Sequence, residues 1–431
     1  MKLITLTAGY VILMTCAATG LADTHYVATN GAHQTPFTNG WGSAATNIQS
    51  AINAAVAADT VLVSNGTYSL SAVITVDGAI TVRGFSGNRD DVIITANGAA
   101  IRGFNLKNNA LLADLTVTNF NAGAVATLDG AGVLLNNGGA TISNCVIVSC
   151  TGRYGGGLNS DSEVYGQTGI VLNCRIEGNS ATASGGGLCN PALVRDCTIR
   201  RNTAQRGAGI ELNGTLNINI FNSTISENSA NTDFGGGIGL AAGAGVVSNC
   251  TIINNTAQAY GGGISFNASG AQLYNCLIAN NSATVNYGGG IRFSGATNNL
   301  FNCTVAGNTA PQGGGLYAAD VTSMRMLNTI IYSNTAPSSS NYNFNTNYLT
   351  NCCSPGLSGQ GNIAAYPKFV DMVNSNYRLQ GGSPCINAGL NLDWMAGSKD
   401  LDGRERLDRL TRQVDIGTYE FMFSGTMFSV R

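Results

Sequence analysis

A phrase of about 26 residues recurs through the middle of this chain. It begins with Asn-Cys-Thr-Ile or a close variant, continues with Asn-Ser-Ala or Asn-Thr-Ala, and ends with Gly-Gly-Gly-Ile. The first element recurs at Asn144, Asn173, Asp196, Asn222, Asn249, Asn275, Asn302 and Asn328, and the glycine element at 155–157, 185–187, 207–209, 235–237, 261–263, 288–290 and 313–315. Two motifs that stay in phase over seven periods indicate an architecture of stacked repeats.

The pattern within each repeat favours strands and turns over helices. Short runs such as 250–252 and 264–266 alternate between core-type and polar side chains, which is the period of a strand. Three consecutive glycines would cost a helix about 2–3 kcal/mol, but they suit a turn. A unit with two or three short strands cannot bury its own apolar face, whereas stacked units bury it against one another. We therefore predict an all-β parallel solenoid with successive coils about 4.8 Å apart.

The repeated cysteines are predicted to form a column inside the solenoid. In residues 276–279 the first and third side chains should point inward and the second and fourth outward. Ser223 and Thr329 fill two rungs of the same column. Because parallel side chains hold sulfur atoms in poor geometry for a disulfide, we expect free, buried thiols. The sequence places three further cysteines outside this column and leaves their redox state open: Cys352, Cys353 and Cys385.

A second repeated position holds asparagine before Ser or Thr and Ala. Stacked turns should bring these amides into a ladder that satisfies buried polar groups. The members are Asn179, Asn202, Asn228, Asn255, Asn281, Asn308 and Asn334. Asn249 and Asn302 match a glycan-acceptor sequon, but we expect both to lie on packed strands.

Both ends of the solenoid need caps that cover exposed strand edges. Residues 46–57 predict a capping helix, since Ile48, Ile52 and Val56 recur every four residues and Thr46 can act as its N-cap. Strands are expected near 59–68, 73–82, 92–94, 111–117 and 132–135, and the repeat dissolves after about Ala336.

These observations divide the chain into five segments. The first resembles an export signal, with Lys2, a mostly apolar stretch over 3–18 and small residues before Asp23. The expected segments are a signal peptide over 1–22, an N-terminal strand and capping helix over 23–58, solenoid coils over 59–336, a C-terminal closing region over 337–421, and a tail over 422–431. We expect an exported protein, secreted or at the cell surface.

Composition excludes two classes of partner. The net charge is −2 and only 10% of residues are charged, against about 25% in an ordinary domain. A near-neutral chain lacks the basic surface that nucleic acid requires, so no nucleic-acid partner is expected. No mature stretch has the 18 or so consecutive apolar residues of a membrane helix, and we expect a monomer without a membrane span.

The repeats and the C-terminal motifs resemble known families. The whole arrangement resembles the pectin-lyase-like superfamily of right-handed parallel β-helices. The Gly-Gly-Gly-Ile and Ile-x-x-Asn elements are similar to polymorphic outer-membrane-protein repeats. Residues 383–389, 400–404 and 414–421 resemble the choice-of-anchor Q domain of exported bacterial proteins. The superfamily implies a right-handed β-helix, and for some members a polysaccharide lyase or glycoside hydrolase activity.

Such an enzyme would need clustered carboxylates with a basic group on neighbouring coils. On the glycine-led strand the predicted outward residues include Asn159, Cys189, Glu211, Ser265 and Arg292, and no two acids are adjacent. The catalytic candidates are Glu211, Glu163 and Arg200. The charged group around Arg175, Glu177, Arg200 and Arg206, with Tyr260 and Tyr287, is the candidate ligand-binding set, although surface ion pairs are the favoured explanation of the charges.

Asp400 and Asp402 precede a glycine in a turn that resembles a calcium-binding loop. Ca²⁺ is therefore the one candidate cofactor, and a salt-bridged cap with Arg404 and Arg406 is the alternative. Two hypotheses for function follow. The first is a non-catalytic solenoid that binds a polysaccharide or a surface protein along its flank. The second is a polysaccharide lyase or glycoside hydrolase of the pectin-lyase-like type.

Overall fold

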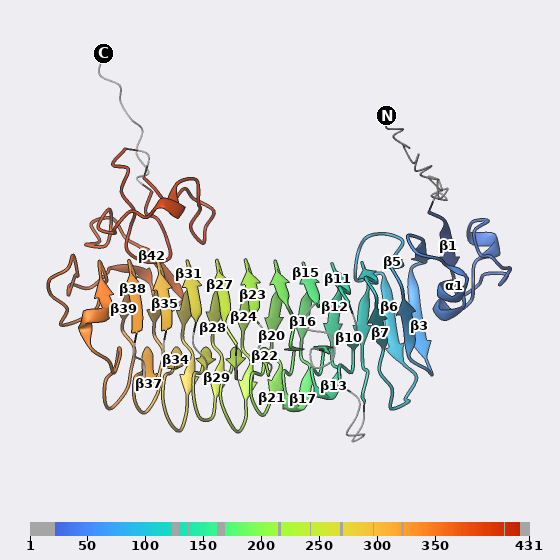
Figure 1. Ribbon diagram of the computed structural model, residues 1–431, viewed down its shortest axis with the longest axis horizontal. Helices are drawn as coiled ribbons and strands as arrows, with labels where there is room; N and C mark the ends of the chain where they lie inside the picture. Colours follow the sequence, from blue (N-terminus) through green and yellow to red (C-terminus); the bar gives the residue numbers. More distant parts are fainter. Residues whose placement is uncertain are drawn as a thin grey trace, which may run out of the picture.

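The computed structural model describes residues 22–122, 129–136, 138–161, 169–213, 217–241, 243–267, 270–295, 297–319, 323–408 and 410–422. In these ranges the chain winds into stacked coils whose strands form four parallel sheets along one long axis (Figure 1). Within a complete coil the chain runs through sheet A, sheet B, sheet D and sheet C in that order, before it enters sheet A of the next coil. The A–B corner therefore lies opposite the D–C corner.

The strands have the following bounds. Sheet A contains β1 Thr24–Val27, β2 Thr60–Val63, β5 Thr81–Gly84, β8 Leu111–Ala113, β11 Thr141–Ser143, β15 Ile170–Leu172, β19 Leu193–Arg195, β23 Ile218–Phe221, β27 Gly245–Ser248, β31 Ala271–Tyr274, β35 Thr297–Phe301, β38 Ser323–Leu327 and β40 Leu349–Thr350. Sheet B contains β3 Gly66–Leu70, β6 Val92–Ala96, β9 Thr116–Thr118, β12 Val146–Val148, β16 Arg175–Glu177, β20 Thr198–Arg200, β24 Thr224–Ser226, β28 Thr251–Ile253, β32 Leu277–Ala279, β36 Thr304–Ala306 and β39 Ile330–Tyr332. Sheet C contains β4 Ile74–Asp77, β7 Phe104–Lys107, β10 Val133–Leu135, β14 Leu158–Ser160, β18 Leu188–Cys189, β22 Ile210–Leu212, β26 Ile238–Leu240, β30 Ile264–Phe266, β34 Ile291–Ser294 and β37 Leu316–Ala319. Sheet D contains β13 Thr151–Tyr154, β17 Ser180–Ser184, β21 Thr203–Ala204, β25 Ser229–Ala230, β29 Thr256–Ala257 and β33 Ser282–Ala283.

The predicted stacking is confirmed. Strands of successive coils pair in parallel and in register, so that Ile252 lies beside Ile278. The repeated cysteines form a buried column in the main core, in which the Cys145 amide donates to Cys174 Sγ and the Cys174 amide to Cys197 Sγ, both at 3.4 Å. All eleven described cysteines are free and buried, as predicted for the column.

The column is longer than the sequence analysis proposed. Strand β40 pairs with β38, which places Cys352 one coil above Thr329. The Cys352 thiol donates to the carbonyl of Met326 at 3.5 Å, as Cys303 does to Leu273 at 3.7 Å. Placing Cys352 outside the column was therefore wrong, because its coil lacks the glycine element that marked the other repeats. The solenoid extends beyond Ala336 to this coil.

The two other repeated elements also stack as predicted. Along the asparagine ladder each side-chain amide donates to the next, for example Asn228 Nδ2 to Asn255 Oδ1 at 2.9 Å and Asn255 Nδ2 to Asn281 Oδ1 at 3.0 Å. In the glycine element Gly261 has a φ of 59°, and a Cβ on Gly262 would lie 2.3 Å from the carbonyl oxygen of Ser282. Glycine is needed there because neighbouring backbones touch.

The N-terminal cap differs in detail from the prediction. Helix α1 spans Ile48–Ala54, and its N-cap is Asn47, whose side chain accepts a hydrogen bond from Ser50 N at 2.8 Å. Assigning Thr46 as the N-cap was wrong by one residue. Ile48 and Ile52 are buried against the first coil, but Val56 follows the helix and is 68% exposed. The single strand expected over 73–82 is two strands, β4 and β5, on different sheets.

The C-terminal residues fold back onto the solenoid. We call residues 366–421 the closing segment; it contains the antiparallel pair β41 Phe369–Asp371 and β42 Asn376–Leu379 and the short helix η3 Asp393–Met395. Two further short helices, η1 Trp41–Ser43 and η2 Thr346–Tyr348, lie near the two ends. The closing segment buries an apolar cluster against the outward face of sheet B, including Leu277, Ala279, Ala306 and Ile330. It rises over the A–B corner at the C-terminal end (Figure 1).

Candidate ligand-binding site

The residue before each cysteine of the column forms a second stack of polar side chains, at the A–B corner. We call this stack the amide row. Its members, all with φ between 47° and 56°, are Asn144, Asn173, Asp196, Asn222, Asn249, Asn275, Asn302, Asn328 and Asn351. Asn and Asp tolerate this left-handed conformation better than other non-glycine residues. The expectation that Asn249 and Asn302 lie on strands was wrong, because the chain turns the corner at these positions.

The amide row is covered at both ends and open in between. Asn275, Asn302 and Asn328 are at most 3% exposed because the closing segment lies over them. Asn328, for example, donates to Leu390 O at 2.9 Å and accepts from Leu390 N at 2.7 Å. At the other end Asn144 donates to Gly87 O at 3.0 Å.

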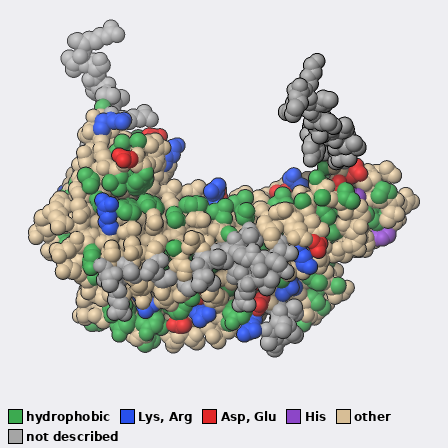
Figure 2. Space-filling view, viewed as in Figure 1, with side chains coloured by type: hydrophobic (Ala, Val, Ile, Leu, Met, Phe, Trp, Pro, Cys, Tyr) green, Lys and Arg blue, Asp and Glu red, His purple; other side chains and the backbone are tan. Residues whose placement is uncertain are grey.

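The open stretch consists of Asn173, Asp196 and Asn222, which are exposed, and Asn249, which is half-buried. In Figure 2 the outline of this ridge dips between the closing segment and the N-terminal end. Asn249 Nδ2 donates to Asn222 Oδ1 at 3.3 Å, and Asn222 Nδ2 donates to Asp196 Oδ1 at 3.1 Å. Because each side-chain NH₂ has two hydrogens and uses one along the row, the open stretch keeps both donors and acceptors for a ligand.

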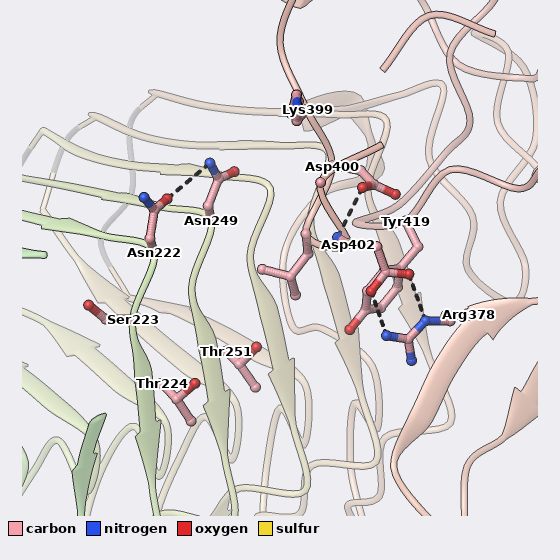
Figure 3. Close-up of a pocket in the computed structure, with 12 residues that line it drawn as sticks. Asn222, Ser223, Thr224, Asn249, Thr251, Arg378, Lys399, Asp400, Asp402 and Tyr419 are labelled. Carbon is pink, nitrogen blue, oxygen red and sulfur yellow. Dashed lines mark hydrogen bonds and ion pairs between the residues drawn. The ribbon is translucent and has the colours of Figure 1, made fainter. Parts of the chain in front are cut away.

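A groove of about 560 Å³ lies where the open stretch meets the closing segment (Figure 3). One wall comes from neighbouring coils of the solenoid, with Asn222 and Asn249 above Thr224 and Thr251. The other wall comes from the closing segment. Its lining side chains are Arg378, Lys399, Asp400, Leu401, Asp402 and Tyr419.

A second groove of about 560 Å³ shares Asn249 and Lys399 with the first. It is lined by Tyr274 and by Trp394, whose indole is 37% exposed and meets the Tyr274 ring edge-on at 5.5 Å. The two grooves together present amides, hydroxyls, one ammonium group and three aromatic rings. The sequence analysis did not propose Asn222, Asn249, Lys399 or Trp394, although the asparagine column was visible in the repeat.

Asp400 and Asp402, the predicted metal ligands, hold the turn at the rim of the groove. Asp400 Oδ1 accepts from the amides of Asp402 (2.9 Å) and Arg404 (2.7 Å), and its Oδ2 accepts from the amide of Glu420 (2.8 Å). Asp402 forms a two-pronged ion pair with Arg378, at 2.7 and 2.5 Å. Among the described residues no group of three His, Cys, Asp or Glu side chains converges on one point. This arrangement favours the salt-bridged alternative, and calcium stays a prediction from sequence.

A buried ion pair fixes the closing segment beside the groove. Arg406 is fully buried and donates to Glu420 Oε1 at 2.7 Å and to Asn275 Oδ1 of the amide row at 2.6 Å. It also donates to the carbonyls of Gly417 and Thr418, at 3.0 and 2.8 Å. The position of the groove wall therefore depends on Arg406.

Docking of the closing segment should weaken as the pH rises. Burial raises the pKa of Glu420 to about 8 and that of Asp415 to about 6. Both pKa values lie above those of unfolded Glu and Asp, about 4.3 and 3.9, so the docked state binds more protons than the undocked state. The docked state therefore loses stability as the pH rises from the unfolded pKa to the docked pKa of each group. We expect a loss of about 5 kcal/mol from pH 5 to pH 8, most of it from Glu420. Trp394 emission during heating of a Trp41→Phe variant measures it; a melting temperature that stays constant or rises over this range would contradict the prediction.

The predicted ligand-binding residues fall into two separate places. Arg175, Glu177 and Arg200 do come together on sheet B, directly beside the open stretch of the amide row. Glu177 Oε2 lies 2.9 Å from Arg200 Nη2 and 3.8 Å from Arg175 Nε. Arg201 lies 3.4 Å from the same carboxylate and 2.8 Å from Glu227. This charged cluster flanks the groove.

The other predicted residues, Arg206, Tyr260 and Tyr287, lie on the opposite side, at the D–C corner. The rings of Tyr260 and Tyr287 are 5.7 Å apart, and Tyr287 stacks on Tyr317 at 4.3 Å. The guanidinium of Arg292 lies 4.7 Å from the centre of the Tyr260 ring. These residues cannot contact the same small ligand as the groove.

The catalytic candidates do not form a site. Glu211 is fully buried beneath the D–C corner, 3.3 Å from Arg206, with its carboxylate packed against Gly207 and Gly239. Burial raises the pKa of Glu211 well above its usual value. Cys189 and Ser265 of the same column, also predicted to face outward, are fully buried. Glu211, Cys189 and Ser265 point away from the core as predicted, but they are not exposed to solvent because the glycine turn folds over this face. Glu163 lies outside the described residues.

Comparison with known proteins agrees with this architecture. A family model described as "right handed beta helix region" matches residues 92–278. The solved structure of pectate lyase Pel9A superimposes with a TM-score of 0.54 over 94% of this chain and 98% of that chain, at 14% sequence identity. The chain is a right-handed parallel β-helix. Because the sequence identity is only 14%, the similarity to this structure shows the fold and nothing about function.

The A-module of the mannuronan C-5 epimerase AlgE6 from Azotobacter vinelandii gives a TM-score of 0.41 over 74% of this chain and 94% of that chain, at 16% identity. No curated protein matches the β-helix. Among the described residues, no helix is both long and apolar enough to cross a membrane.

Proposed function

We propose that this β-helix is an exported, non-catalytic protein that binds a linear glycan along the open stretch of the amide row. The main observation behind the proposal is that side chains of the same kind in the amide row are buried at one end and exposed in the middle. The same amides that hold the closing segment at Asn275, Asn302 and Asn328 face solvent at Asn173 and Asn222. A glycan would occupy the place that polypeptide occupies at either end.

The chemistry of the groove suits sugar hydroxyl groups. Each hydroxyl both donates and accepts, and so does each side-chain amide of the row. Thr224 and Thr251 add hydroxyls below the amides, and Trp394 offers a half-exposed ring for stacking against a sugar face. The rungs repeat about every 4.8 Å, which is close to the length of one sugar unit in an extended chain.

Export is part of the same proposal. It rests on the apolar N-terminal stretch and on the resemblance of the repeats to polymorphic outer-membrane-protein repeats and of residues 383–421 to the choice-of-anchor Q domain. The charged cluster of Arg175, Glu177 and Arg200 beside the row would extend the contact to charged sugars. A surface protein is the alternative partner for this flank.

A panel of immobilised polyuronates and neutral glycans tests the proposal. We expect the wild-type protein to be retained and the double variant Asn222→Gly/Asn249→Gly to bind at least about tenfold more weakly, since two to four hydrogen bonds are lost at about 0.5–1.5 kcal/mol each. Glycine keeps the left-handed backbone of both positions. Tyr287→Ala, at the opposite corner, is the control and should bind normally. Loss of binding in Tyr287→Ala with normal binding by the double variant would move the site to the D–C corner.

The alternative is a polysaccharide lyase or glycoside hydrolase with acids supplied from loops. Incubating the protein with the same panel and analysing soluble products separates the two functions. Bond cleavage that is abolished by Glu211→Ala or Glu163→Ala would overturn the non-catalytic proposal. Retention without products supports it.

A further inference from the structure

The vicinal cysteines Cys352 and Cys353 belong to two different cores. Adjacent residues of an extended chain point to opposite sides, so Cys352 enters the interior of the solenoid while Cys353 faces outward. There it joins the apolar cluster under the closing segment, and its thiol donates to Ala365 O at 3.3 Å.

Cys385 reaches the same cluster from the closing segment. It is fully buried, its amide donates to Ser383 Oγ at 3.2 Å, and its carbonyl accepts from Ile416 N at 2.9 Å. Cys353 and Cys385 are both fully buried in this one cluster, where the thiol of Cys385 faces that of Cys353. Both thiols lie near the Tyr332 hydroxyl on the last strand of sheet B.

This pair differs from the cysteine column. In the column, side chains of equivalent residues run parallel and each thiol is hydrogen-bonded to backbone carbonyls, for instance Cys276 to Val247 O at 3.3 Å and Tyr274 O at 3.2 Å. Parallel Cβ vectors do not give the dihedral angle of a disulfide. Cys353 pairs in parallel with Ile330 and not with another cysteine. Cys385 approaches from the closing segment, so the two thiols are not equivalent members of one parallel stack.

We propose that Cys353 and Cys385 form a disulfide that fastens the closing segment to the last coil of the β-helix. The oxidant is a disulfide, either of a small thiol such as oxidised glutathione or of a thiol–disulfide oxidoreductase. A thiolate of the pair attacks it and forms a mixed disulfide, and the second thiolate displaces the remaining thiol. Two electrons pass to the oxidant, which leaves as two thiols that carry the two protons.

The order of events follows from burial. The neighbouring thiol of Cys353 and burial raise the pKa of Cys385 far above its usual value, and a protonated, buried thiol is a poor nucleophile. The exchange therefore takes place while the closing segment is undocked, and docking then shields the bond. The loop between the two residues spans 31 positions, from 354 to 384, and closing it restricts the undocked state. This staple is independent of glycan binding.

The test uses the full-length protein refolded with reduced or oxidised glutathione, alkylated under denaturing conditions and digested with trypsin. Cleavage after Arg325, Lys368, Arg378 and Lys399 releases Cys352 and Cys353 in one peptide and Cys385 in another. We expect the oxidised sample to contain these two peptides cross-linked, and reduction to separate them. Cys352→Ser should keep the cross-link, whereas Cys353→Ser and Cys385→Ser should each abolish it.

A second readout does not depend on folding of the cysteine variants. The measurement uses the Trp41→Phe variant with all its cysteines intact, in which Trp394 emission reports on the closing segment. Reduction of the oxidised protein should lower the melting temperature of this segment by about 5 °C or more. Full alkylation of Cys353 and Cys385 after oxidative refolding, or a cross-link that Cys352→Ser removes, would overturn the proposal.

Discussion

Replacing Asn255 with leucine is expected to destabilise the β-helix by about 3 kcal/mol or more. Asn255 Oδ1 accepts from both the backbone amide and the side-chain amide of Asn228, at 3.0 and 2.9 Å. Its Nδ2 donates to Ile225 O at 2.9 Å and to Asn281 Oδ1 at 3.0 Å. Leucine fills a similar volume but leaves these groups buried without partners, and each unsatisfied group costs about 1–3 kcal/mol.

Urea denaturation followed by circular dichroism measures the loss. Asn231→Leu is the matched control, because Asn231 is exposed one coil earlier and its replacement should change stability by less than about 0.5 kcal/mol. Equal denaturation midpoints for Asn255→Leu and Asn231→Leu would show that the buried amides contribute nothing beyond their packing. A large difference would identify the ladder as a continuous stabilising element, since every rung both donates and accepts.

The internal architecture of the solenoid could be predicted from sequence because it is periodic. Stacking places every Cys of the column and every Asn of the ladder in the same environment, so one argument about Cys276 or Asn281 applies to all coils. The failures occur where another part of the chain, either a turn of the repeat or the closing segment, covers a position that points outward. Glu211 points away from the core as predicted, yet the turn at Gly207 covers it.

The sequence analysis expected a C-terminal closing region, but it did not predict that this region docks on the outward face of sheet B, although a signal was present. The outward positions of sheet B change from Thr224 and Thr251 to Leu277, and from Ser226 to Ala279. Two apolar side chains that point outward from the same solenoid strand imply that another segment of protein packs over them. The concentration of charged residues over 399–415 also indicated that this segment makes specific contacts. What sequence could not supply is which residues the segment contacts, because Arg406 and Asn275 are separated by 131 positions.

Replacing Arg406 with methionine is expected to release the closing segment while the coils remain folded. The guanidinium makes four hydrogen bonds in full burial, and methionine keeps the apolar stem but none of the donors. Removal of the guanidinium leaves the Glu420 carboxyl, the Asn275 side-chain oxygen and two backbone carbonyls buried without their donor. Because each unsatisfied buried group costs about 1–3 kcal/mol, we expect a loss of about 3–5 kcal/mol or more.

Limited trypsinolysis measures the release, because trypsin needs a flexible backbone and docking restrains the bond after Lys399, whose carbonyl accepts from Asn275 Nδ2 at 3.1 Å. Cleavage there should be at least tenfold faster in Arg406→Met, while far-ultraviolet circular dichroism stays that of a folded solenoid. Arg404→Met is the control: Arg404 is half-buried and donates to Glu420 O at 2.8 Å, so its loss should cost about 1 kcal/mol. Digestion is followed at Lys399, which both variants retain. Undocking also removes one wall of the groove, so Arg406→Met should lose glycan affinity without any change to the amide row, which ties the binding site to the docked segment.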